Sequence, residues 1–230
     1  MLSRSEMLLG SDALTKLKNS RVALFGVGGV GGFVAEALIR NGLGSLDVFD
    51  ADTVDISNIN RQIIADSTVI GESKVEVIKS RLEKINPDAK IGAKRIFFSP
   101  ENSSKIDFSV YDYVIDAVDT VTAKIEIIEK AKEKGVKIIS SMGTANKLDP
   151  LALRVADIEK THTCPLARVM RRELSSRKIK DVKVVFSVEK PVISDLLDGE
   201  NGKKIQPSEI FVPATAGLII AKEVILYLIK

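Results

Sequence analysis

Cysteine, histidine and tryptophan are nearly absent from this 230-residue chain. The single cysteine, Cys164, excludes a disulfide within the chain. One histidine, His162, leaves too few thiolate and imidazole ligands for a zinc site built from four such residues. There is no tryptophan and aromatic residues make up 5% of the chain, which argues against RNA binding by extensive base stacking.

Long apolar runs are also missing from the sequence. We find no stretch comparable to the ~20 apolar residues that a membrane-spanning helix needs. Arg4 and Glu6 charge the first ten residues, where a signal peptide would be apolar. We therefore expect a cytoplasmic protein with no membrane association. The formal net charge of +3 is small, so a polyanionic partner must bind a local basic surface.

Short apolar runs alternate with stretches of helical periodicity over the first two thirds of the chain. Strands are predicted at 21–25, 45–50, 90–94, 113–116 and 136–141, and helices at 30–41, 72–85 and 120–134. The short connection between the first helix and the second strand is typical of a βαβ unit with parallel strands. The pattern predicts an α/β fold with a Rossmann-like, doubly wound, mostly parallel sheet.

The character of the sequence changes after Pro150. We divide the chain into a nucleotide-binding domain, 1–150, and a C-terminal extension, 151–230, that should belong to the same fold unit. The extension is predicted to contain strands at 151–156 and 182–187, a basic helix from Pro165, a mobile loop at 189–207 and a buried helix at 214–229.

A glycine-rich motif, Gly26-Val-Gly-Gly-Val-Gly31, lies between the first predicted strand and helix. Glycines let the backbone approach phosphate groups, and the N-terminus of the helix favours negative charge. Asp50 ends the next strand, where a carboxylate can accept hydrogen bonds from ribose hydroxyls. The motif predicts a nucleotide site through Gly26, Gly28, Gly29 and Gly31, but NAD-dependent dehydrogenases share this glycine spacing.

The polar residues that follow favour ATP over a nicotinamide cofactor. A triphosphate needs several cations and hydrogen-bond donors, whereas a nicotinamide ring does not. Farther along, Asp116-Ala-Val-Asp119 leaves a strand for a helix, where Asp119 can hold Mg²⁺ bridging the phosphates; Asp116 is interpreted as structural. The further residues predicted to bind ATP are Asp52, Ser57, Asn58, Asn60, Arg61, Gln62, Lys74, Asp119 and Thr120.

These motifs, in this order, resemble the ThiF/MoeB/HesA adenylating superfamily, which is related to ubiquitin-activating enzymes. The similarity extends from about residue 4 to residue 141. The segments Gly143–Pro150, Asp157–Thr161, Pro165–Arg168 and Phe211–Pro213 resemble the tRNA threonylcarbamoyladenosine dehydratases of that superfamily. The resemblance implies an enzyme that uses ATP and Mg²⁺, with Arg61, Lys74 and Asp119 as catalytic residues. It also implies a homodimer in which an N-terminal arginine, here Arg4, reaches the site of the partner subunit.

One departure from the superfamily bears on the substrate. Enzymes of the superfamily that activate sulfur-carrier proteins usually contain two cysteine pairs that bind zinc, and this chain has one cysteine. Adenylation of a Gly-Gly-ended sulfur-carrier protein therefore stays as the alternative, with a sulfur-transfer or carrier-protein partner. Cys164, at the start of a predicted helix, is either a reactive thiol or a packing residue.

A basic segment gives a hypothesis for the contact with tRNA. On the helix predicted from Pro165, apolar residues fall on one side and arginines on another. Docking of an RNA phosphate backbone and a simple solvated face both fit this arrangement. The residues predicted to bind RNA are Arg168, Arg171, Arg172, Arg177 and Lys178.

The resulting hypothesis is an ATP-dependent cyclising dehydration of threonylcarbamoyladenosine in tRNA. The substrate carboxylate attacks the α-phosphate of ATP, pyrophosphate leaves, and the carbamoyl group then displaces AMP from the acyl-adenylate. Two other classes remain open, namely a protein that binds ATP without turnover and a dehydrogenase. Asn146 and Lys147 follow the last strand of the nucleotide-binding domain and are further residues that could face the acyl substrate.

Overall fold

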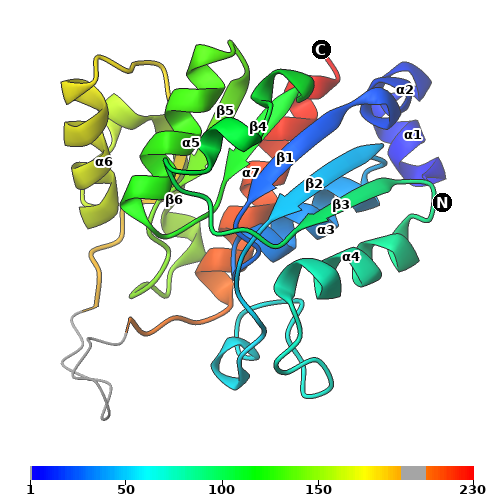
Figure 1. Ribbon diagram of the computed structural model, residues 1–230, viewed down its shortest axis with the longest axis horizontal. Helices are drawn as coiled ribbons and strands as arrows, with labels where there is room; N and C mark the ends of the chain where they lie inside the picture. The colour runs from blue at the N-terminus through cyan, green and yellow to red at the C-terminus, as the bar shows by residue number, and fades with distance from the viewer. Residues whose placement is uncertain (1, 193–205) are drawn as a thin grey trace.

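A seven-stranded sheet forms the centre of the computed structural model, which describes residues 2–192 and 206–230 (Figure 1). The strand order is β3-β2-β1-β4-β5-β7-β6. The pairings are parallel except that of β6 with β7, which is antiparallel. The strands are β1 (Arg21–Phe25), β2 (Ser45–Phe49), β3 (Lys90–Lys94), β4 (Tyr113–Asp116), β5 (Lys137–Ser141), β6 (Leu153–Asp157) and β7 (Lys183–Ser187). The predicted Rossmann-like, mostly parallel α/β fold is confirmed.

Helices cover both faces of this sheet. They are α1 (Ser3–Leu9), α2 (Ser11–Asn19), α3 (Gly31–Arg40), α4 (Lys74–Ile85), α5 (Val121–Glu133), α6 (Pro165–Ser176) and α7 (Phe211–Leu228). Side chains of α3, α4 and α7 pack on one face, and those of α5 and α6 pack on the other. The sheet takes strands from both sides of residue 150, because β7 lies between β5 and β6.

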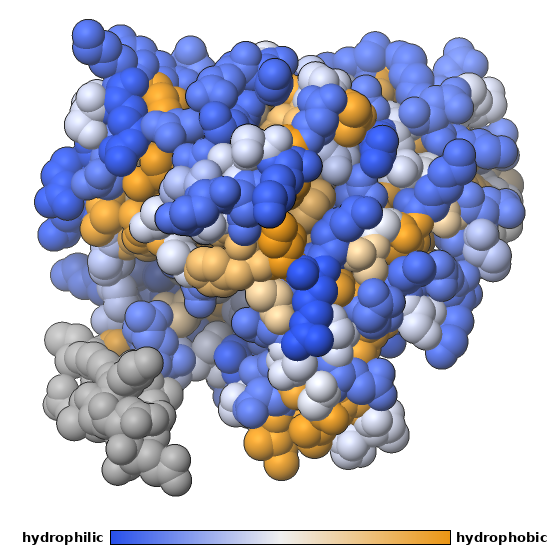
Figure 2. Space-filling model, viewed as in Figure 1, coloured by the Kyte–Doolittle hydropathy of each residue, from blue (hydrophilic) through white to orange (hydrophobic). Residues whose placement is uncertain are grey.

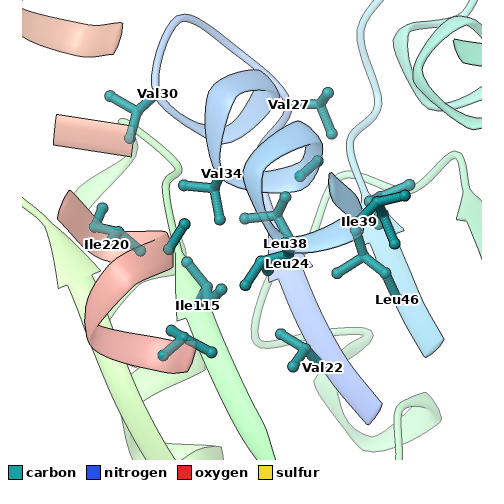
Figure 3. Close-up of a cluster of buried hydrophobic side chains, with 14 of the residues drawn as sticks. Val22, Leu24, Val27, Val30, Val34, Leu38, Ile39, Leu46, Ile115 and Ile220 are labelled. Atoms are coloured by element: carbon teal, nitrogen blue, oxygen red, sulfur yellow. The ribbon is translucent and has the colours of Figure 1, made fainter. Parts of the chain in front are cut away.

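The face under α3, α4 and α7 is almost wholly aliphatic. Figure 3 shows Val34 and Leu38 of α3 lying between Ile220 of α7 and the strands, and all three side chains are fully buried. Gly217 allows α7 to cross α3 closely, because a Cβ atom at this position would lie 2.6 Å from the carbonyl oxygen of Val30. Side chains of α7 thus complete this part of the core.

On the opposite face of the sheet, aromatic side chains pack over β1 and β2. Phe25 stacks on Phe49 and on Phe108, with ring centroids 4.4 and 5.5 Å apart, and Phe98 meets Phe25 edge-on. Phe98 and Phe108 belong to the 95–112 connection between β3 and β4, which also contributes Tyr111 to this cluster. An irregular segment therefore covers this part of the sheet, in place of a helix.

Several predicted boundaries differ from the structure by one to three residues, most of all the start of α7, at Phe211 instead of residue 214. β6 begins at Leu153 because Pro150–Ala152 forms a 3-10 turn, in which Asp149 accepts a hydrogen bond from the backbone of Leu151. α4 begins at Lys74 because residues 72 and 73 bond to the 53–54 backbone instead of entering the helix. Most of the predicted mobile loop at 189–207 lies outside the described residues.

The C-terminal helix α7 corrects one expectation. Among the described residues, α7 is the one helix that is long and apolar enough to span a membrane by length and composition. Its mean hydropathy is 1.7 over 18 residues. The expectation that no apolar segment is long enough to span a membrane is therefore wrong. Val212, Ala216, Ile220 and Val224 of α7 are fully buried in the aliphatic core. This burial identifies α7 as a core helix of the fold, as its predicted burial indicated.

Candidate active site

A cleft of about 880 Å³ opens at the carboxyl ends of the central strands. It lies at the lower edge of the sheet in Figure 1, where the 51–73 loops project. β1 is flanked by β2 and β4 there, which is the point in a doubly wound sheet where nucleotides bind. The cleft is lined by parts of 25–30, 49–52, 61–62, 96–98, 117–120 and 141–145, with Lys74, Leu166, Gln206, Ser208 and Pro213.

The glycines of the motif have two different roles. Gly26 has a positive φ of 89°, and a Cβ atom there would lie 2.6 Å from the carbonyl oxygen of Ala117. Gly31 faces the backbone of Gly26 so closely that no side chain fits. Gly28 and Gly29 border the cleft with more space around them. Gly26 and Gly31 therefore allow the turn to pack closely against the 117–118 backbone, and Gly28 and Gly29 leave the backbone open to a ligand.

Two carboxylates fix the loop beside the glycine turn. Asp50 accepts hydrogen bonds from the backbone N–H of Val27, at 2.7 Å, and from that of Asp52, at 2.9 Å. Asp52 in turn accepts a charged hydrogen bond of 2.9 Å from the Nζ of Lys74. The Lys74 side chain is 8% exposed, whereas that of Asp52 is 68% exposed. The ammonium group is therefore anchored in the wall of the cleft before any ligand arrives.

The segment after Asp50 folds through its own side chains. Asp55 and Asn58 form a reciprocal capping box around a 3-10 turn. The guanidinium of Arg61 donates to the carbonyl oxygen of Ser57 at 2.7 Å and to Oδ1 of Asn60 at 2.9 Å. Asn60 also donates to the carbonyl oxygen of Ser208. Ser57, Asn58 and Asn60 thus position the loop without lining the cleft, while Arg61 lines it.

Gln62 presents an unmatched polar atom at the cleft. Its side chain lines the cleft, and its buried Oε1 has no hydrogen-bond partner among the described residues. A buried acceptor without a donor is costly, by about 1–3 kcal/mol. The residue therefore has an acceptor available for a donor on a bound ligand.

Asp116 and Asp119 differ strongly although they are three residues apart. Asp116 is fully buried, paired with the Nζ of Lys124 at 2.9 Å and bonded to the hydroxyl of Ser140 at 2.5 Å. Lys124 also donates to the carbonyl oxygen of Val118, so this cluster supports the backbone of the 117–120 turn. The structural interpretation of Asp116 agrees with these contacts. The sequence analysis missed Lys124, whose only signal is a lysine on the apolar side of a helix.

Asp119 and Thr120 line the cleft with exposed side chains. The Thr120 hydroxyl donates to the Asp119 carboxylate at 3.3 Å. Among the described residues there is no cluster of three or more His, Cys, Asp or Glu side chains that could hold a metal ion. A Mg²⁺ ion at Asp119 would therefore take its other ligands from phosphate oxygens and water, which is how proteins usually hold it.

Arg4 lies far from the cleft of its own chain. It is an exposed residue of α1, and Leu2 at the start of α1 contacts Gly42, just beyond the C-terminal end of α3. The cleft is at the other end of α3, next to Gly31. Arg4 can therefore reach a cleft only in a second copy of the chain.

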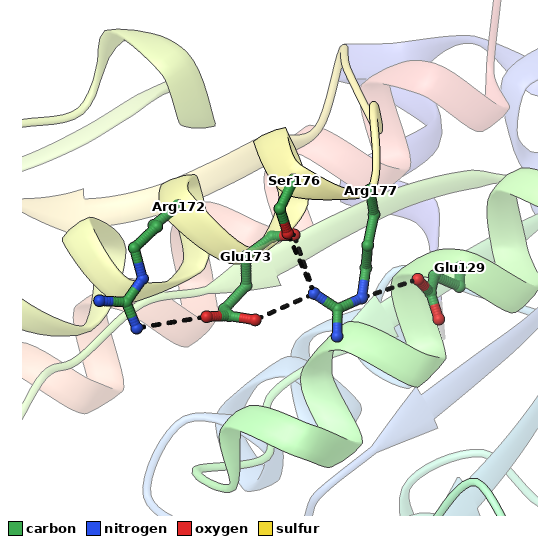
Figure 4. Close-up of polar contacts among 5 residues, drawn as sticks. All are labelled: Glu129, Arg172, Glu173, Ser176 and Arg177. Atoms are coloured by element: carbon green, nitrogen blue, oxygen red, sulfur yellow. Dashed lines mark hydrogen bonds and ion pairs between the residues drawn. The ribbon is translucent and has the colours of Figure 1, made fainter.

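The basic helix α6 uses several of its arginines internally (Figure 4). Arg177 donates to Glu173 and pairs with Glu129 of α5 at 3.1 Å, and Arg172 pairs with Glu173 at 3.2 Å. Arg171 is half-buried and donates to both oxygens of Thr161 at 2.6 Å. The arginine-rich side of α6 is thus less available to RNA than its net charge suggests, because these side chains also hold α6 against the rest of the fold.

Cys164 lies behind the wall of the cleft and does not line it. The thiol is buried, 1% exposed, beside Gly143, which lines the cleft. Lys147 is buried as well, and its ammonium donates to the carbonyl oxygen of Gly143 at 2.7 Å. Burial lowers the pKa of Lys147. His162 is exposed and packs edge-on against Phe186.

The glycine turn at a strand-to-helix junction, the anchored Lys74 and the open Asp119 together define an α/β nucleotide-binding protein of the adenylating type. The chain belongs to the ThiF family, whose profile matches residues 2–229.

Known relatives place it more narrowly within that family. The chain is 41% identical to tRNA threonylcarbamoyladenosine dehydratase from Bacillus subtilis, over 99% of this chain and 94% of the relative. The crystal structure of the Escherichia coli tRNA N6-threonylcarbamoyladenosine dehydratase in complex with ATP superposes with a TM-score of 0.89 at 31% identity, covering 99% of this chain and 93% of that one. The adenylyltransferase and sulfurtransferase uba4 of Ogataea parapolymorpha is 38% identical, but over 58% of this chain and 34% of that protein.

Proposed function

We propose that this protein is an ATP-dependent tRNA threonylcarbamoyladenosine dehydratase. The observation that carries the proposal is the cleft itself, in which Arg61, Lys74 and Asp119 meet around an open glycine turn. The similarity to dehydratases over nearly the whole chain supports the same substrate class. In the sulfur-carrier alternative the similarity to uba4 covers little more than half of the chain.

ATP would bind with its phosphates over Gly28 and Gly29, at the N-terminal end of α3. The open glycines and the helix dipole favour negative charge at this point. Asp50 would accept the ribose hydroxyls, since each carboxylate oxygen keeps a lone pair beyond its bonds to the backbone of 27 and 52. Gln62 offers its unpaired Oε1 to a donor of the same ligand.

Adenylation needs positive charge at the α-phosphate and at the leaving pyrophosphate. Lys74 and Arg61 supply it from fixed positions, because Asp52 holds the first and the 57–60 loop holds the second. Charges fixed in advance stabilise the transition state without reorganisation, so catalysis would be mainly electrostatic and positional. The carbamoyl group of the substrate then attacks the acyl carbon and expels AMP, which closes a ring with net loss of one water.

Asp119 would hold Mg²⁺ together with phosphate oxygens. When bound, Mg²⁺ neutralises charge on the phosphates and polarises them for attack. The exposed position of Asp119 in the cleft suits this role, and the hydrogen bond from Thr120 limits its rotation.

We also propose that the enzyme works as a homodimer in the cytoplasm. Apolar side chains on one side of α7 stay exposed in the single chain, among them Phe211, at 56%, and Leu218, at 53%. Exposed apolar patches of this kind mark protein contacts. A second copy of the chain could cover them and bring Arg4 of α1 toward the partner cleft. In this proposal, residues 1–150 carry the nucleotide and residues 151–230 complete the same fold unit.

Mass analysis of tRNA nucleosides tests the proposed reaction. The purified protein is incubated with tRNA carrying linear threonylcarbamoyladenosine, with Mg²⁺ and ATP, while pyrophosphate is measured in parallel. We expect the modified nucleoside to lose one water only when ATP is present. Pyrophosphate release with a Gly-Gly-ended carrier protein, and none with tRNA, would instead support the sulfur-carrier alternative. ATP binding without pyrophosphate release would indicate a nucleotide-binding protein that is not an enzyme.

Two substitutions test the assigned residues. Arg61→Ala and Asp119→Asn should each reduce turnover about 10²–10³-fold, the usual loss when one electrostatic stabiliser of a transition state is removed. Both side chains line the cleft, and Asp119 is exposed, so thermal unfolding should change little. Lys134→Gln, an exposed residue after α5, is the matched control and should keep full activity. Full turnover in either cleft variant would remove that residue from the mechanism.

A further inference from the structure

A second hollow lies on the aromatic face of the sheet, next to the cleft. It has a volume of about 570 Å³ and is bounded by β2, β3 and the connection that follows β3. Phe49 and Ile96 line both hollows, so the two are adjacent. We call this hollow the β3 groove; its charged lining residues are Arg21, Asp47, Lys94, Arg95, Lys105 and Asp107.

The floor of the β3 groove is neutralised and rigid. Asp47 is buried, accepts a charged hydrogen bond of 2.7 Å from Arg21 and a second bond of 2.9 Å from the hydroxyl of Tyr111. Burial and the Asp47 carboxylate raise the pKa of Tyr111, so the phenol stays a neutral donor. The Arg21 guanidinium also lies over the Tyr111 ring, 5.2 Å from its centroid. This network gives the groove a fixed shape and adds no net charge.

The rim of the groove is basic. Lys94, Arg95 and Lys105 are exposed, and among the described residues none of the three has a carboxylate within 4.0 Å. The one acidic rim residue, Asp107, accepts hydrogen bonds from the backbone and hydroxyl of Ser109. Arg95 donates to the carbonyl oxygen of Ala51 at 3.4 Å, and Ala51 lines the cleft. Free positive charge therefore extends from the groove to the mouth of the cleft.

The helix α6 differs from this rim in the use of its cations. Arg171 is bonded to Thr161, and Arg172 and Arg177 pair with carboxylates. Cations already paired within the protein gain less from an incoming phosphate, because the existing pair must be broken. On α6 and its C-terminal end, Arg168 and Lys178 have no carboxylate within 4.0 Å among the described residues, whereas all three cations on the rim of the β3 groove are in that state. The rim is therefore the better match for a polyanion.

We infer that the β3 groove binds the phosphate backbone of the tRNA beside the nucleoside that enters the cleft. The inference rests on the proposed function and extends it, since the RNA contact moves from α6 to the segment between β3 and β4. Among the described residues, three cations without a carboxylate partner line a hollow that adjoins the catalytic cleft. Phe97 lines the cleft and is 61% exposed. An unstacked base can pack on its ring. Figure 2 shows this face of the molecule, with exposed apolar side chains near its centre and hydrophilic ones around them.

Binding of tRNA by charge-removing variants of the full chain tests the inference. The groove variant is Lys94→Gln, Arg95→Gln, Lys105→Gln. An α6 variant carries Arg168→Gln, Arg172→Gln, Lys178→Gln. The charge-matched control carries Lys18→Gln, Lys84→Gln, Lys230→Gln, three exposed lysines outside both surfaces. Each protein is titrated with fluorescent tRNA at several NaCl concentrations, and its affinity for ATP and its dehydration rate at subsaturating tRNA are measured.

The groove variant should bind tRNA about 10–100-fold more weakly than the unaltered protein. Its slope of log affinity against log salt should fall by about 2, since three lost phosphate contacts contribute ~0.7 each for a single strand. Its affinity for ATP should stay the same, and the control should bind tRNA normally. Unchanged tRNA binding in the groove variant, or a larger loss in the α6 variant, would overturn the inference and leave the proposed function intact. Failure of the unaltered protein to bind tRNA at all would overturn both.

Discussion

The two faces of the central sheet are covered in different ways. Three helices, α3, α4 and α7, cover one face with aliphatic side chains. The other face is covered by α5 and α6 over β4, β5 and β7, and by an irregular connection over β1 and β2. Aromatic rings and two buried polar networks, around Asp47 and Asp116, are found on this second face.

This difference explains where the ligand sites are. Regular helices place side chains at even intervals and fill the space above a sheet with close packing. An irregular segment covers the sheet through a few large side chains, here Phe98, Phe108 and Tyr111. Phe49 and Ile96, beside these side chains, line both the cleft and the β3 groove. The packed face thus supplies stability, and the irregular face supplies surfaces for binding.

Breaking the buried ion pair on the irregular face should have the largest effect. Lys124→Met leaves the Asp116 carboxylate buried without its cation, and removal of one partner of such a pair destabilises a protein by about 3–5 kcal/mol. The 117–120 turn also loses the bond from Lys124 to Val118, so affinity for ATP should fall. Urea unfolding and ATP titration measure the two effects. The double variant Asp116→Asn, Lys124→Met should recover part of the stability; a single variant as stable as the parent would contradict this account.

A pair of core truncations sharpens the contrast between the faces. Leu38→Ala on the packed face and Phe98→Ala on the irregular face should each lower the free energy of unfolding by about 3 kcal/mol. Phe98 lines the cleft, so its loss should also weaken ATP binding about tenfold, whereas Leu38→Ala should leave ATP affinity unchanged. Denaturant unfolding and calorimetric titration give both values. Equal ATP affinities in the two variants would show that the faces do not differ in this way.

The smallest effect is expected at the rim of the packed face. Glu36 of α3 accepts hydrogen bonds from Arg40, at 2.8 Å, and from Arg81 of α4, at 2.6 Å. Burial alone would raise the pKa of Glu36, but these two arginines together lower it below its ordinary value of 4.5. The carboxylate therefore stabilises the fold above that value, and the contribution is lost as the pH falls through the lowered pKa.

Glu36→Gln should cost about 1–2 kcal/mol at pH 7. The difference from the parent should shrink as the pH falls through the lowered pKa of Glu36, because the parent glutamate is then itself protonated. Unfolding midpoints measured at several pH values test this dependence. A constant difference across that range would indicate a packing defect in place of a charge effect.

The sequence predicts the local parts of this molecule well. The strand, glycine turn and helix around Gly26–Gly31 depend on residues that are neighbours in the chain, and their spacing is enough to predict them. Asp50, Asp52, Arg61, Gln62 and Lys74 could likewise be assigned to one cleft, because they follow the same strand, whereas Ser57, Asn58 and Asn60 do not line it. The ends of β6 and α4 are set by short hydrogen-bonded turns that periodicity does not report.

Contacts between distant segments could not be predicted in the same way. The partner of Asp116 is a lysine on the following helix, and the pairing requires that this helix turn onto the sheet. The sequence predicts Arg171 on the basic side of α6. In the structure, Arg171 donates its hydrogen bonds to Thr161, ten residues earlier. The β3 groove depends on the path of an irregular connection, which sequence periodicity does not describe.

The position of α7 in the chain has a consequence for protein synthesis. This helix follows all seven strands in sequence, yet it completes the aliphatic core against α3. Until the ribosome has added α7, the side chains of Val30, Val34 and their neighbours on α3 lack the helix that buries them. The nascent chain therefore exposes an apolar surface until α7 emerges. Premature termination upstream of α7 would yield a product prone to aggregation and proteolysis.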